Sequence, residues 1–532
     1  MDAESDSRVR SGHALERAER TWPLETSGAT ASGVSNWGLT RGLTPGCRPQ
    51  PCLRERAVPF CLVVKVWLAA LATALVLVGG NASGSTAARQ DVSIAMDDGV
   101  SIAATLYVPD GAPPAGGWPA IVFLHGLAGN RQQMNALVEG YGFTSGPYAI
   151  LTFDARGHGQ SGGLVGINGP REVADIRAIH TSLGARSEIS ETTIGAWGIS
   201  YGGGGVFNSL VAGVPWTAVV AVETWTDLYT ALMPQGLVKS GVVVGFSSSI
   251  PAGRRDPSLD ATLTQAFAGN AAAVRAWAAE RSSISKLGST TTPVFMAQGR
   301  RDFAFGIDQG TRAFNALKGP KTLYVGLHGH APSTFPAADT GFLMTKVRGW
   351  FDCFLRGTGC EPGRTAVYVA SEKFAGQVAR RGTLPPVSPT FVSFPGVTTF
   401  AKSGKAVRTS APLRKAIEVY GSPTVQTSIA ASGGWSRLVA VLTARTPAGK
   451  EILVSAGGVP TQPGAQKVTI QLVNQATFVP RGSRLTLTLA SASTAQSAAN
   501  LLYLDLPMPA TARARVGTAT VKLPGLRTPV TK

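Results

Sequence analysis

Short, fully apolar runs alternate with longer mixed segments through the first two thirds of the chain. The apolar runs have the length of buried strands, and the mixed segments between several of them have helical character. We predict strands at Ala120–Leu124, Ala149–Phe153, Thr193–Trp197, Ala218–Val222, Pro293–Ala297 and Thr322–Val325. We predict helices at Val173–Leu183, Val206–Ala212, Ile307–Leu317 and Gly341–Leu355. Apolar strands that alternate with helices indicate a mainly parallel sheet covered on both faces, an α/β architecture.

Two segments depart from this alternation. Asp91–Ala95 and Ser101–Val108 alternate polar and apolar residues around Asp97-Asp98-Gly99, which predicts a hairpin before the parallel sheet. Residues from about 228 to 290 mix small apolar residues with helix formers, as in Ala271–Arg281, and predict a helical insertion that caps the sheet.

The pattern changes after residue 357, where Gly, Pro and Thr interrupt the chain. Residues 365–532 carry period-two runs rich in Val, Thr and Ser, which predict a separate, all-β sandwich. Such runs occur at Thr365–Val369, Arg437–Leu442, Lys467–Leu472 and Ser483–Leu489. We therefore expect a leader over 1–88, an α/β catalytic domain over 89–357 and a β-sandwich over 365–532.

The N-terminal part reads as a leader and an export signal. Residues 1–60 lack periodicity and are expected to be disordered. Val66–Gly80 is apolar, basic residues precede it, and small residues follow, with Ser85-x-Ala87 as a candidate cleavage site. This order predicts a secreted or extracytoplasmic protein whose native start lies near residues 54–63. The alternative is an uncleaved anchor, through which alone the chain would contact a membrane.

Composition favours a folded, basic protein of more than one domain. Of 532 residues, 44% are hydrophobic and 15% are charged, and the net charge is +18. Residues 1–88 contain nine Lys/Arg and seven Asp/Glu, which leaves a net charge of +16 on the remainder. That charge could steer the protein toward an anionic envelope or polymer. No dense Lys/Arg run with interleaved aromatic residues is present, which argues against nucleic-acid binding.

Five cysteines divide into two groups. Cys47, Cys52 and Cys61 lie before or within the apolar segment, so a processed chain keeps only Cys353 and Cys360. An exported protein can oxidise such a pair, and we predict a disulfide that closes a small loop. Two free thiols are the alternative.

The candidate nucleophile lies in Gly198-Ile199-Ser200-Tyr201-Gly202, a G-x-S-x-G sequence between a predicted strand and a predicted helix. A sharp turn in this context exposes the serine hydroxyl and places it at the N-terminus of a helix. Without that context, the sequence would be a glycine-rich loop with a chance serine. The following glycines lack the lysine and the spacing of a phosphate-binding loop.

A serine nucleophile needs a histidine base, and the histidine needs a carboxylate. Asp302 follows the strand at 293–297, and His330 follows the strand at 322–325, so both are expected at the edge where Ser200 lies. Asp227 and Glu223 are the competing carboxylates, and His328 is the competing base. We predict Ser200, Asp302 and His330 as the catalytic residues.

Two backbone N–H groups are expected to form an oxyanion hole. We predict the N–H of Tyr201, directly after the nucleophile, and the N–H of Leu127, in the loop after the strand at 120–124. His328 and His330 could instead bind a metal, but no third ligand is nearby in the sequence, so we expect neither a metal nor a cofactor. His125 and His158 are expected to make structural hydrogen bonds.

These motifs resemble one family. Trp197–Gly203 is similar to the nucleophile motif of the X-Pro dipeptidyl-peptidase (S15) and cocaine-esterase-like α/β hydrolases, and Gly326–His330 matches the family's G-x-x-x-H turn, which favours His330 over His328. Phe478–Leu485 is similar to part of the family's C-terminal jelly-roll domain. The resemblance covers about residues 91–532. It implies an α/β-hydrolase sheet with a helical cap, followed by an all-β jelly-roll sandwich.

The resemblance has one departure. Cocaine-esterase-like members use a Tyr side chain in the oxyanion hole, whereas His125–Asn130 contains no Tyr and resembles generic esterases and lipases. The resemblance thus implies a secreted serine hydrolase acting through an acyl-enzyme on small-molecule or peptide acyl substrates, with ester and X-Pro amide bonds both open. The alternative is a catalytically silent protein that binds polysaccharide or cell wall.

Overall fold

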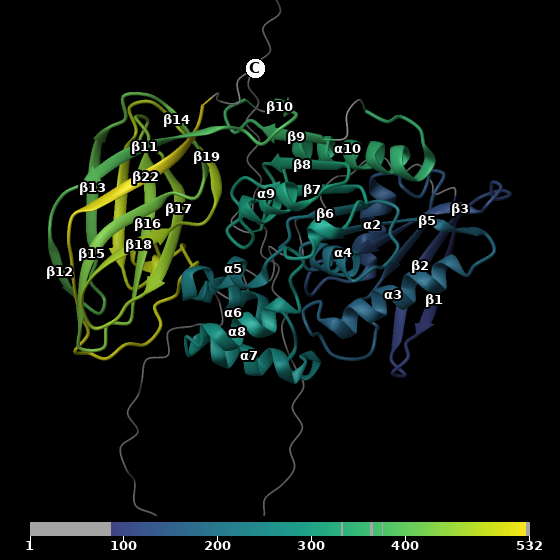
Figure 1. The fold of residues 1–532 in the computed structure, drawn as a ribbon, viewed down its shortest axis with the longest axis horizontal. Coiled ribbons are helices and arrows are strands. Elements are labelled where there is room, and N and C mark those ends of the chain that lie inside the picture. Colours follow the sequence, from purple (N-terminus) through teal and green to yellow (C-terminus); the bar gives the residue numbers. More distant parts are fainter. Residues whose placement is uncertain (1–86, 331–332, 362–364, 375, 528–532) are drawn as a thin grey trace, which may run out of the picture. The chain divides into compact units, whose positions relative to one another are not determined.

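The computed structural model describes residues 87–330, 333–361, 365–374 and 376–527. A ten-stranded sheet in the order β1-β2-β4-β3-β5-β6-β7-β8-β9-β10 forms its centre (Figure 1). The strands are parallel from β4 through β3 to β9, and antiparallel pairs flank them at both edges. Their bounds are β1 Ala87–Ala95, β2 Ser101–Pro109, β3 Trp118–Leu124, β4 Ala149–Phe153, β5 Ile189–Ile199, β6 Val219–Val222, β7 Val294–Gly299, β8 Lys321–Gly326, β9 Thr365–Ala370 and β10 Val378–Arg381.

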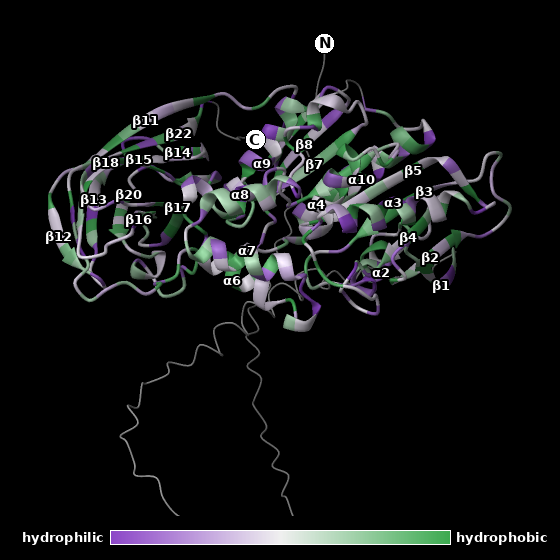
Figure 2. Cartoon of the chain, turned by 60° about the horizontal axis from the view of Figure 1, so that its bottom comes forward, coloured by the Kyte–Doolittle hydropathy of each residue, from purple (hydrophilic) through white to green (hydrophobic). Residues whose placement is uncertain are grey.

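Helices cover both faces of this sheet, which explains why its strands are apolar throughout. The side chains of β3 alternate between two cores, with Val122 in one and Ile121 in the other. Helices α3, α4 and α9 pack in the first core, and α2 and α10 pack in the second. The central strands appear in green, the hydrophobic end of the scale, in Figure 2. The helix bounds are α2 Arg131–Gly140, α3 Pro170–Gly184, α4 Tyr201–Val211, α9 Ile307–Ala316 and α10 Ala337–Arg356.

The insertion between β6 and β7 is helical, as its composition predicts. It contains four α-helices, α5 Leu228–Leu232, α6 Ser240–Ser248, α7 Pro257–Phe267 and α8 Ala271–Ala279. Short 3-10 turns lie between these helices at Pro234–Gly236 and Ala252–Arg254, and another follows α8 at Leu287–Ser289. Their apolar faces share a core with Trp225 and Phe305 from the ends of the sheet and with sandwich residues such as Val439 and Val441. We call residues 228–290 the cap.

The C-terminal region forms two antiparallel sheets. One has eight strands, with β12-β21-β15-β22-β14-β19 as its path and β11 and β18 beside it, and the other has the order β13-β20-β16-β17. Apolar side chains from both sheets form the core between them. The strands are β11 Val387–Phe394, β12 Thr398–Ala401, β13 Ala406–Pro412, β14 Ile417–Gly421, β15 Thr424–Ser432, β16 Arg437–Arg445, β17 Glu451–Pro460, β18 Gly464–Gln471, β19 Gln475–Val479, β20 Arg484–Ala490, β21 Arg513–Val516 and β22 Ala519–Leu526.

Two expected boundaries are wrong. Thr365–Ala370, which we placed in the sandwich, is β9 and pairs parallel with β8, so the central sheet extends to Arg381 and the sandwich begins at Val387. A short apolar strand has the same sequence pattern in a parallel sheet and in a sandwich, and only the strand with which it pairs distinguishes the two. Ala87 and Ala88, which we assigned to the leader, begin β1. The rest of the predicted leader and export signal lies outside the described residues.

Among the described residues, no helix combines the length and the apolar character needed to cross a membrane.

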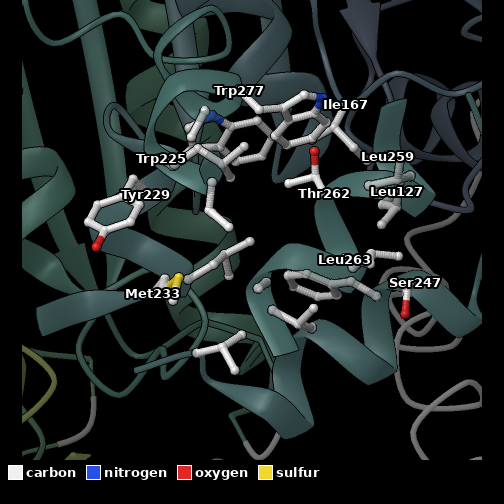
Figure 3. A pocket seen from close by; sticks show the side chains of 18 of the residues that line it. Leu127, Ile167, Trp225, Tyr229, Met233, Ser247, Leu259, Thr262, Leu263 and Trp277 are labelled. Carbon is white, nitrogen blue, oxygen red and sulfur yellow. The ribbon is translucent and has the colours of Figure 1, made fainter. Parts of the chain in front are cut away.

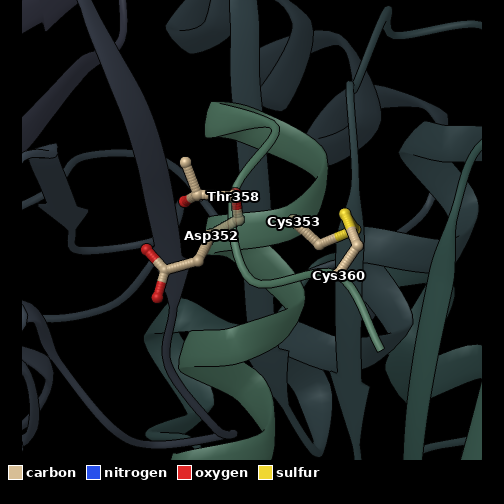
Figure 4. Close-up of a disulfide and its surroundings, with 4 residues drawn as sticks. All are labelled: Asp352, Cys353, Thr358 and Cys360. Carbon is tan, nitrogen blue, oxygen red and sulfur yellow. A yellow bond between two sulfur atoms is a disulfide. The ribbon is translucent and has the colours of Figure 1, made fainter. Parts of the chain in front are cut away.

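Cys353 and Cys360 form a disulfide at the end of α10 (Figure 4). The helix stops at Gly357, whose φ of 69° is the left-handed conformation that favours glycine. The N–H of Gly357 donates to the carbonyl of Cys353, and the N–H of Thr358 donates to that of Asp352, so the chain reverses there. This reversal places the two cysteine Cα atoms 4.6 Å apart.

The disulfide generates a first prediction. Replacing both Cys353 and Cys360 with Ser lowers the free energy of unfolding by about 2 kcal/mol, because the unfolded chain loses a small covalent loop. Denaturant unfolding of the two proteins measures this difference. Alkylation of the denatured protein followed by peptide mass spectrometry is the companion test. If Cys353 and Cys360 are alkylated in the denatured protein before any reduction, the disulfide is contradicted.

Candidate active site

Ser200 lies in a sharp turn between β5 and α4. Its backbone has φ 54° and ψ −114°, a strained conformation for a residue with a side chain. The Ser200 N–H donates to the carbonyl of Val222 over 2.8 Å, and its carbonyl accepts from the Thr224 hydroxyl over 2.7 Å. These hydrogen bonds to the end of β6 fix the strained residue at the edge of the sheet.

The glycines on either side of Ser200 are required by space. A Cβ atom on Gly198 would collide with the carbonyl of Gly202, and a Cβ atom on Gly202 would collide with the carbonyl of Leu124. The G-x-S-x-G sequence therefore reflects the close approach of the turn to its own strand and to β3.

The structure brings the three predicted catalytic residues together. Ser200 Oγ lies 2.8 Å from His330 Nε2, and His330 Nδ1 lies 2.7 Å from Asp302 Oδ2. All three side chains are buried, and Asp302 is completely inaccessible to solvent. A Nδ1–H that donates to the carboxylate leaves Nε2 free to accept the serine proton.

Asp302 is held as a carboxylate by hydrogen bonds from its own loop. Its Oδ1 accepts from the N–H groups of Ala304 and Phe305, at 2.9 and 3.0 Å. Burial alone raises the pKa of Asp302, but the charge of His330, the hydrogen bond from its side chain and the backbone N–H of Phe305 outweigh burial, so the pKa lies below its usual value. The carboxylate is therefore charged at neutral pH.

The cap and the sandwich both contact the loop that carries Asp302. From the cap, the buried ammonium group of Lys239 donates to the carbonyls of Phe303 and Ala304 at 2.9 and 3.1 Å, and burial lowers its pKa to about 8. From β19 of the sandwich, Gln475 donates to the Asp302 carbonyl over 2.7 Å. The loop is thus restrained by segments far apart in the sequence, which periodicity does not reveal.

His328 and the competing carboxylates have other partners. His328 Nδ1 forms a short hydrogen bond with Glu223 and does not contact Ser200 in the structure. Asp227 caps α5 by accepting from the Thr230 N–H, and it forms an ion pair with Arg312. The structure therefore places His330 beside the serine and Asp302 beside His330, while His328 and Asp227 bind other residues.

Glu223 nevertheless contributes charge to the site. Its carboxylate lies within 4.8 Å of ligand atoms of Asp302 and His330, a cluster whose donor atoms could also surround a cation. Burial lowers the pKa of His330, but the charge of Asp302, its hydrogen bond and the charge of Glu223 outweigh burial and raise the pKa above its ordinary value. From the sequence alone, Glu223 is only an alternative to Asp302 as the catalytic carboxylate, because its hydrogen bond with His328 depends on the tertiary fold.

The predicted oxyanion-hole residues lie at the same edge. Tyr201 begins α4, so its N–H is one of the unpaired donors at a helix N-terminus. Leu127 lines the same cavity as Ser200, and a Cβ atom on the neighbouring Gly126 would lie 3.8 Å from Ser200 Cβ. His125 Nε2 accepts from the Ala155 N–H, and burial lowers the pKa of His125 to about 4, which agrees with a structural role for this neutral side chain.

A cavity of about 100 Å³ opens from Ser200 into the cap. Its walls are apolar and aromatic, and its residues come mainly from cap helices α5 to α8 (Figure 3). The labelled side chains include Trp225, Tyr229, Met233, Leu263 and Trp277. Sequence reasoning placed the cap but did not identify this lining, because each residue alone reads as ordinary core.

Comparisons with known proteins agree with this fold. Residues 98–332 match the sequence model of the X-Pro dipeptidyl-peptidase (S15) family. A CocE/NonD family hydrolase from Staphylococcus aureus aligns with 83% of this chain and 94% of its own, with a TM-score of 0.65 and 12% identity. An α-amino acid ester hydrolase aligns with 84% of this chain and 98% of its own, with a TM-score of 0.62 and 14% identity. At these identities, the structural neighbours show the fold.

A curated sequence relative is among the proteins that match. It is an uncharacterized 31.7 kDa protein of the traX-finO intergenic region of Escherichia coli, 36% identical over 111 residues, which are 20% of this chain and 37% of that protein. The chain thus spans little more than a third of the length of this relative.

The predicted fold class, an α/β-hydrolase sheet with a helical cap and a C-terminal all-β region, is confirmed. So is the resemblance that the nucleophile motif indicated. Residues 98–332, which include the Ser200 motif, are therefore similar to the X-Pro dipeptidyl-peptidase (S15) family, and the chain shares its fold with a CocE/NonD family hydrolase and an α-amino acid ester hydrolase.

Proposed function

We propose that the protein is a secreted serine hydrolase that cleaves ester or peptide acyl bonds through an acyl-enzyme on Ser200, with His330 as base and Asp302 as its partner. The observation that carries the proposal is the continuous hydrogen-bonded chain from Ser200 Oγ through His330 to Asp302. A serine hydroxyl is a weak nucleophile until a neighbouring imidazole accepts its proton, and this arrangement supplies that imidazole.

The reaction follows from the positions of these groups. Ser200 Oγ attacks the substrate carbonyl while its proton passes to His330 Nε2, and Asp302 stabilises the imidazolium that forms. The N–H groups of Tyr201 and Leu127 donate to the oxyanion. His330 then gives its proton to the leaving group, and a water molecule attacks the acyl-enzyme with His330 as base again. The oxyanion hole in this proposal uses backbone donors alone.

Two features support secretion. The apolar segment Val66–Gly80, which lies outside the described residues, has the composition of an export signal. The Cys353–Cys360 disulfide suits an oxidising compartment. We propose a cell-envelope or extracellular location on these grounds.

Removal of the nucleophile is the direct test of the proposed activity. Ser200→Ala lowers kcat for a short p-nitrophenyl ester by about 10⁴-fold or more, because no other group forms the acyl-enzyme. Ser248→Ala is a matched control, since Ser248 is exposed on cap helix α6 and bonds only to its own helix. Full activity of Ser200→Ala would refute the proposal. Inactivity of the wild-type chain toward both esters and X-Pro anilides would favour the catalytically silent binding protein.

The raised pKa of His330 predicts the pH dependence. The base works only when neutral, so activity is lost as pH falls through this pKa, and the acid limb of kcat/KM lies at higher pH than the pKa of an ordinary histidine would place it. Glu223→Gln removes a negative charge that favours the imidazolium, so the limb shifts to lower pH. A pH series of kcat/KM for both proteins measures the shift.

The control for this series is Glu280→Gln, which makes the same chemical change at an exposed cap carboxylate paired with Arg281. Its acid limb should coincide with that of the wild type. A limb that stays in place or moves to higher pH in Glu223→Gln would show that Glu223 does not act on His330 through its charge.

A further inference from the structure

We propose that the cavity in the cap is an acyl-chain pocket and that the preferred substrates are esters of uncharged aliphatic acids. This inference rests on the proposed function, because it assigns a substrate class to the same serine. It adds to that function that the acyl side of the scissile bond enters the cap and that this side is uncharged and aliphatic.

The cavity surface that adjoins Ser200 is almost entirely carbon. No lining residue among those the structure describes carries a charge. The Ser247 hydroxyl donates to the Val244 carbonyl, and the Thr262 hydroxyl donates to the Ser258 carbonyl, so neither has a proton left to donate to a ligand. The indole N–H of Trp225 donates to the Arg281 carbonyl, and that of Trp277 to the Ser258 hydroxyl. A ligand in this space finds dispersion contacts and no free hydrogen-bond donor on these groups.

The position of the cavity selects the acyl side of the substrate. Leu127 and Tyr201, the proposed oxyanion donors, line it together with Ser200, whereas His330 does not. Phe305 and Phe246 also line it and contact the His330 ring, with centroids 5.1 and 5.9 Å away. The leaving group must lie next to His330 Nε2 to receive its proton. A leaving group inside the cap would be separated from that nitrogen by the two phenylalanine rings, so the chain on the acyl carbon is the part that enters.

The same lining excludes a charged amino terminus. An ammonium group moved from water into this cavity loses its hydration and gains no carboxylate in return. Lys239, the buried cation nearby, has its ammonium group directed at the carbonyls of Phe303 and Ala304. X-Pro dipeptides, whose N-terminus is protonated at neutral pH, are therefore poor ligands for this pocket, and neutral aliphatic chains are good ones.

Two ester series separate the acyl side from the alcohol side. The first keeps p-nitrophenol and lengthens the acyl chain from acetate to hexanoate, and the second keeps acetate and lengthens an alkyl alcohol by the same number of carbons. We expect kcat/KM to rise about fourfold per methylene in the first series, on the order of 100-fold in total, until the pocket is filled. In the second series, we expect a change of less than about threefold.

A variant that fills the pocket tests its location. Leu263→Trp on α7 adds volume to the lining, and Thr264→Trp makes a comparable addition at the next, exposed position of the same helix. Leu263→Trp should abolish most of the gain in kcat/KM from acetate to hexanoate, because the added indole occupies the space that the longer chain would fill. Thr264→Trp should keep the full gain, and circular dichroism of both variants checks their folding.

The outcomes distinguish this inference from the proposed function. If acetate is hydrolysed but rates do not rise with acyl length, or rise with alcohol length instead, the acyl pocket is wrong and the serine hydrolase stands. If Leu263→Trp keeps the wild-type gain, the chain binds elsewhere. If no ester in either series is hydrolysed and Ser200 resists a fluorophosphonate, both proposals fail together.

Discussion

The strained backbone of Ser200 is the constraint on which the site depends. A residue with φ 54° and ψ −114° persists only where its surroundings hold it, and here hydrogen bonds from the end of β6 and the close approach of β3 do so. This turn lifts the hydroxyl to His330 and places Tyr201 at the start of α4. A single turn thus has three consequences. It requires glycine at positions 198 and 202, it brings the Ser200 hydroxyl within hydrogen-bonding distance of His330, and it supplies the Tyr201 N–H as an oxyanion donor.

The second part of the site, the Asp302 loop, is assembled from three regions of the chain. The loop begins at the end of β7, Lys239 of the cap binds its carbonyls, and Gln475 of the sandwich binds the carbonyl of Asp302. Next to it, the Ala476 N–H donates to the carbonyl of Arg300, whose guanidinium donates to Glu418. The sandwich therefore contributes to the position of the acid and not only to the stability of its own core.

The sequence was informative where local chemistry decides the structure. Strands at 120–124 and 149–153, the turn at Ser200 and the order of Ser200, Asp302 and His330 could all be predicted, because apolar periodicity and steric need act within a few residues. It was less informative where distant segments meet. The pairing of β9 with β8, the bond between Glu223 and His328 and the contact of Gln475 with Asp302 arise from the tertiary fold. The apolar cavity likewise exists only once four cap helices and the sheet edge have packed together.

The central claim is that an acyl group passes through Ser200. The most direct measurement is rapid-quench peptide mass spectrometry during hydrolysis of a slowly deacylating ester. The account predicts the acyl mass on the peptide that contains Ser200, formed before free acid accumulates and lost when substrate is exhausted. Turnover without any acylated Ser200, or with the acyl group on another residue, would contradict it.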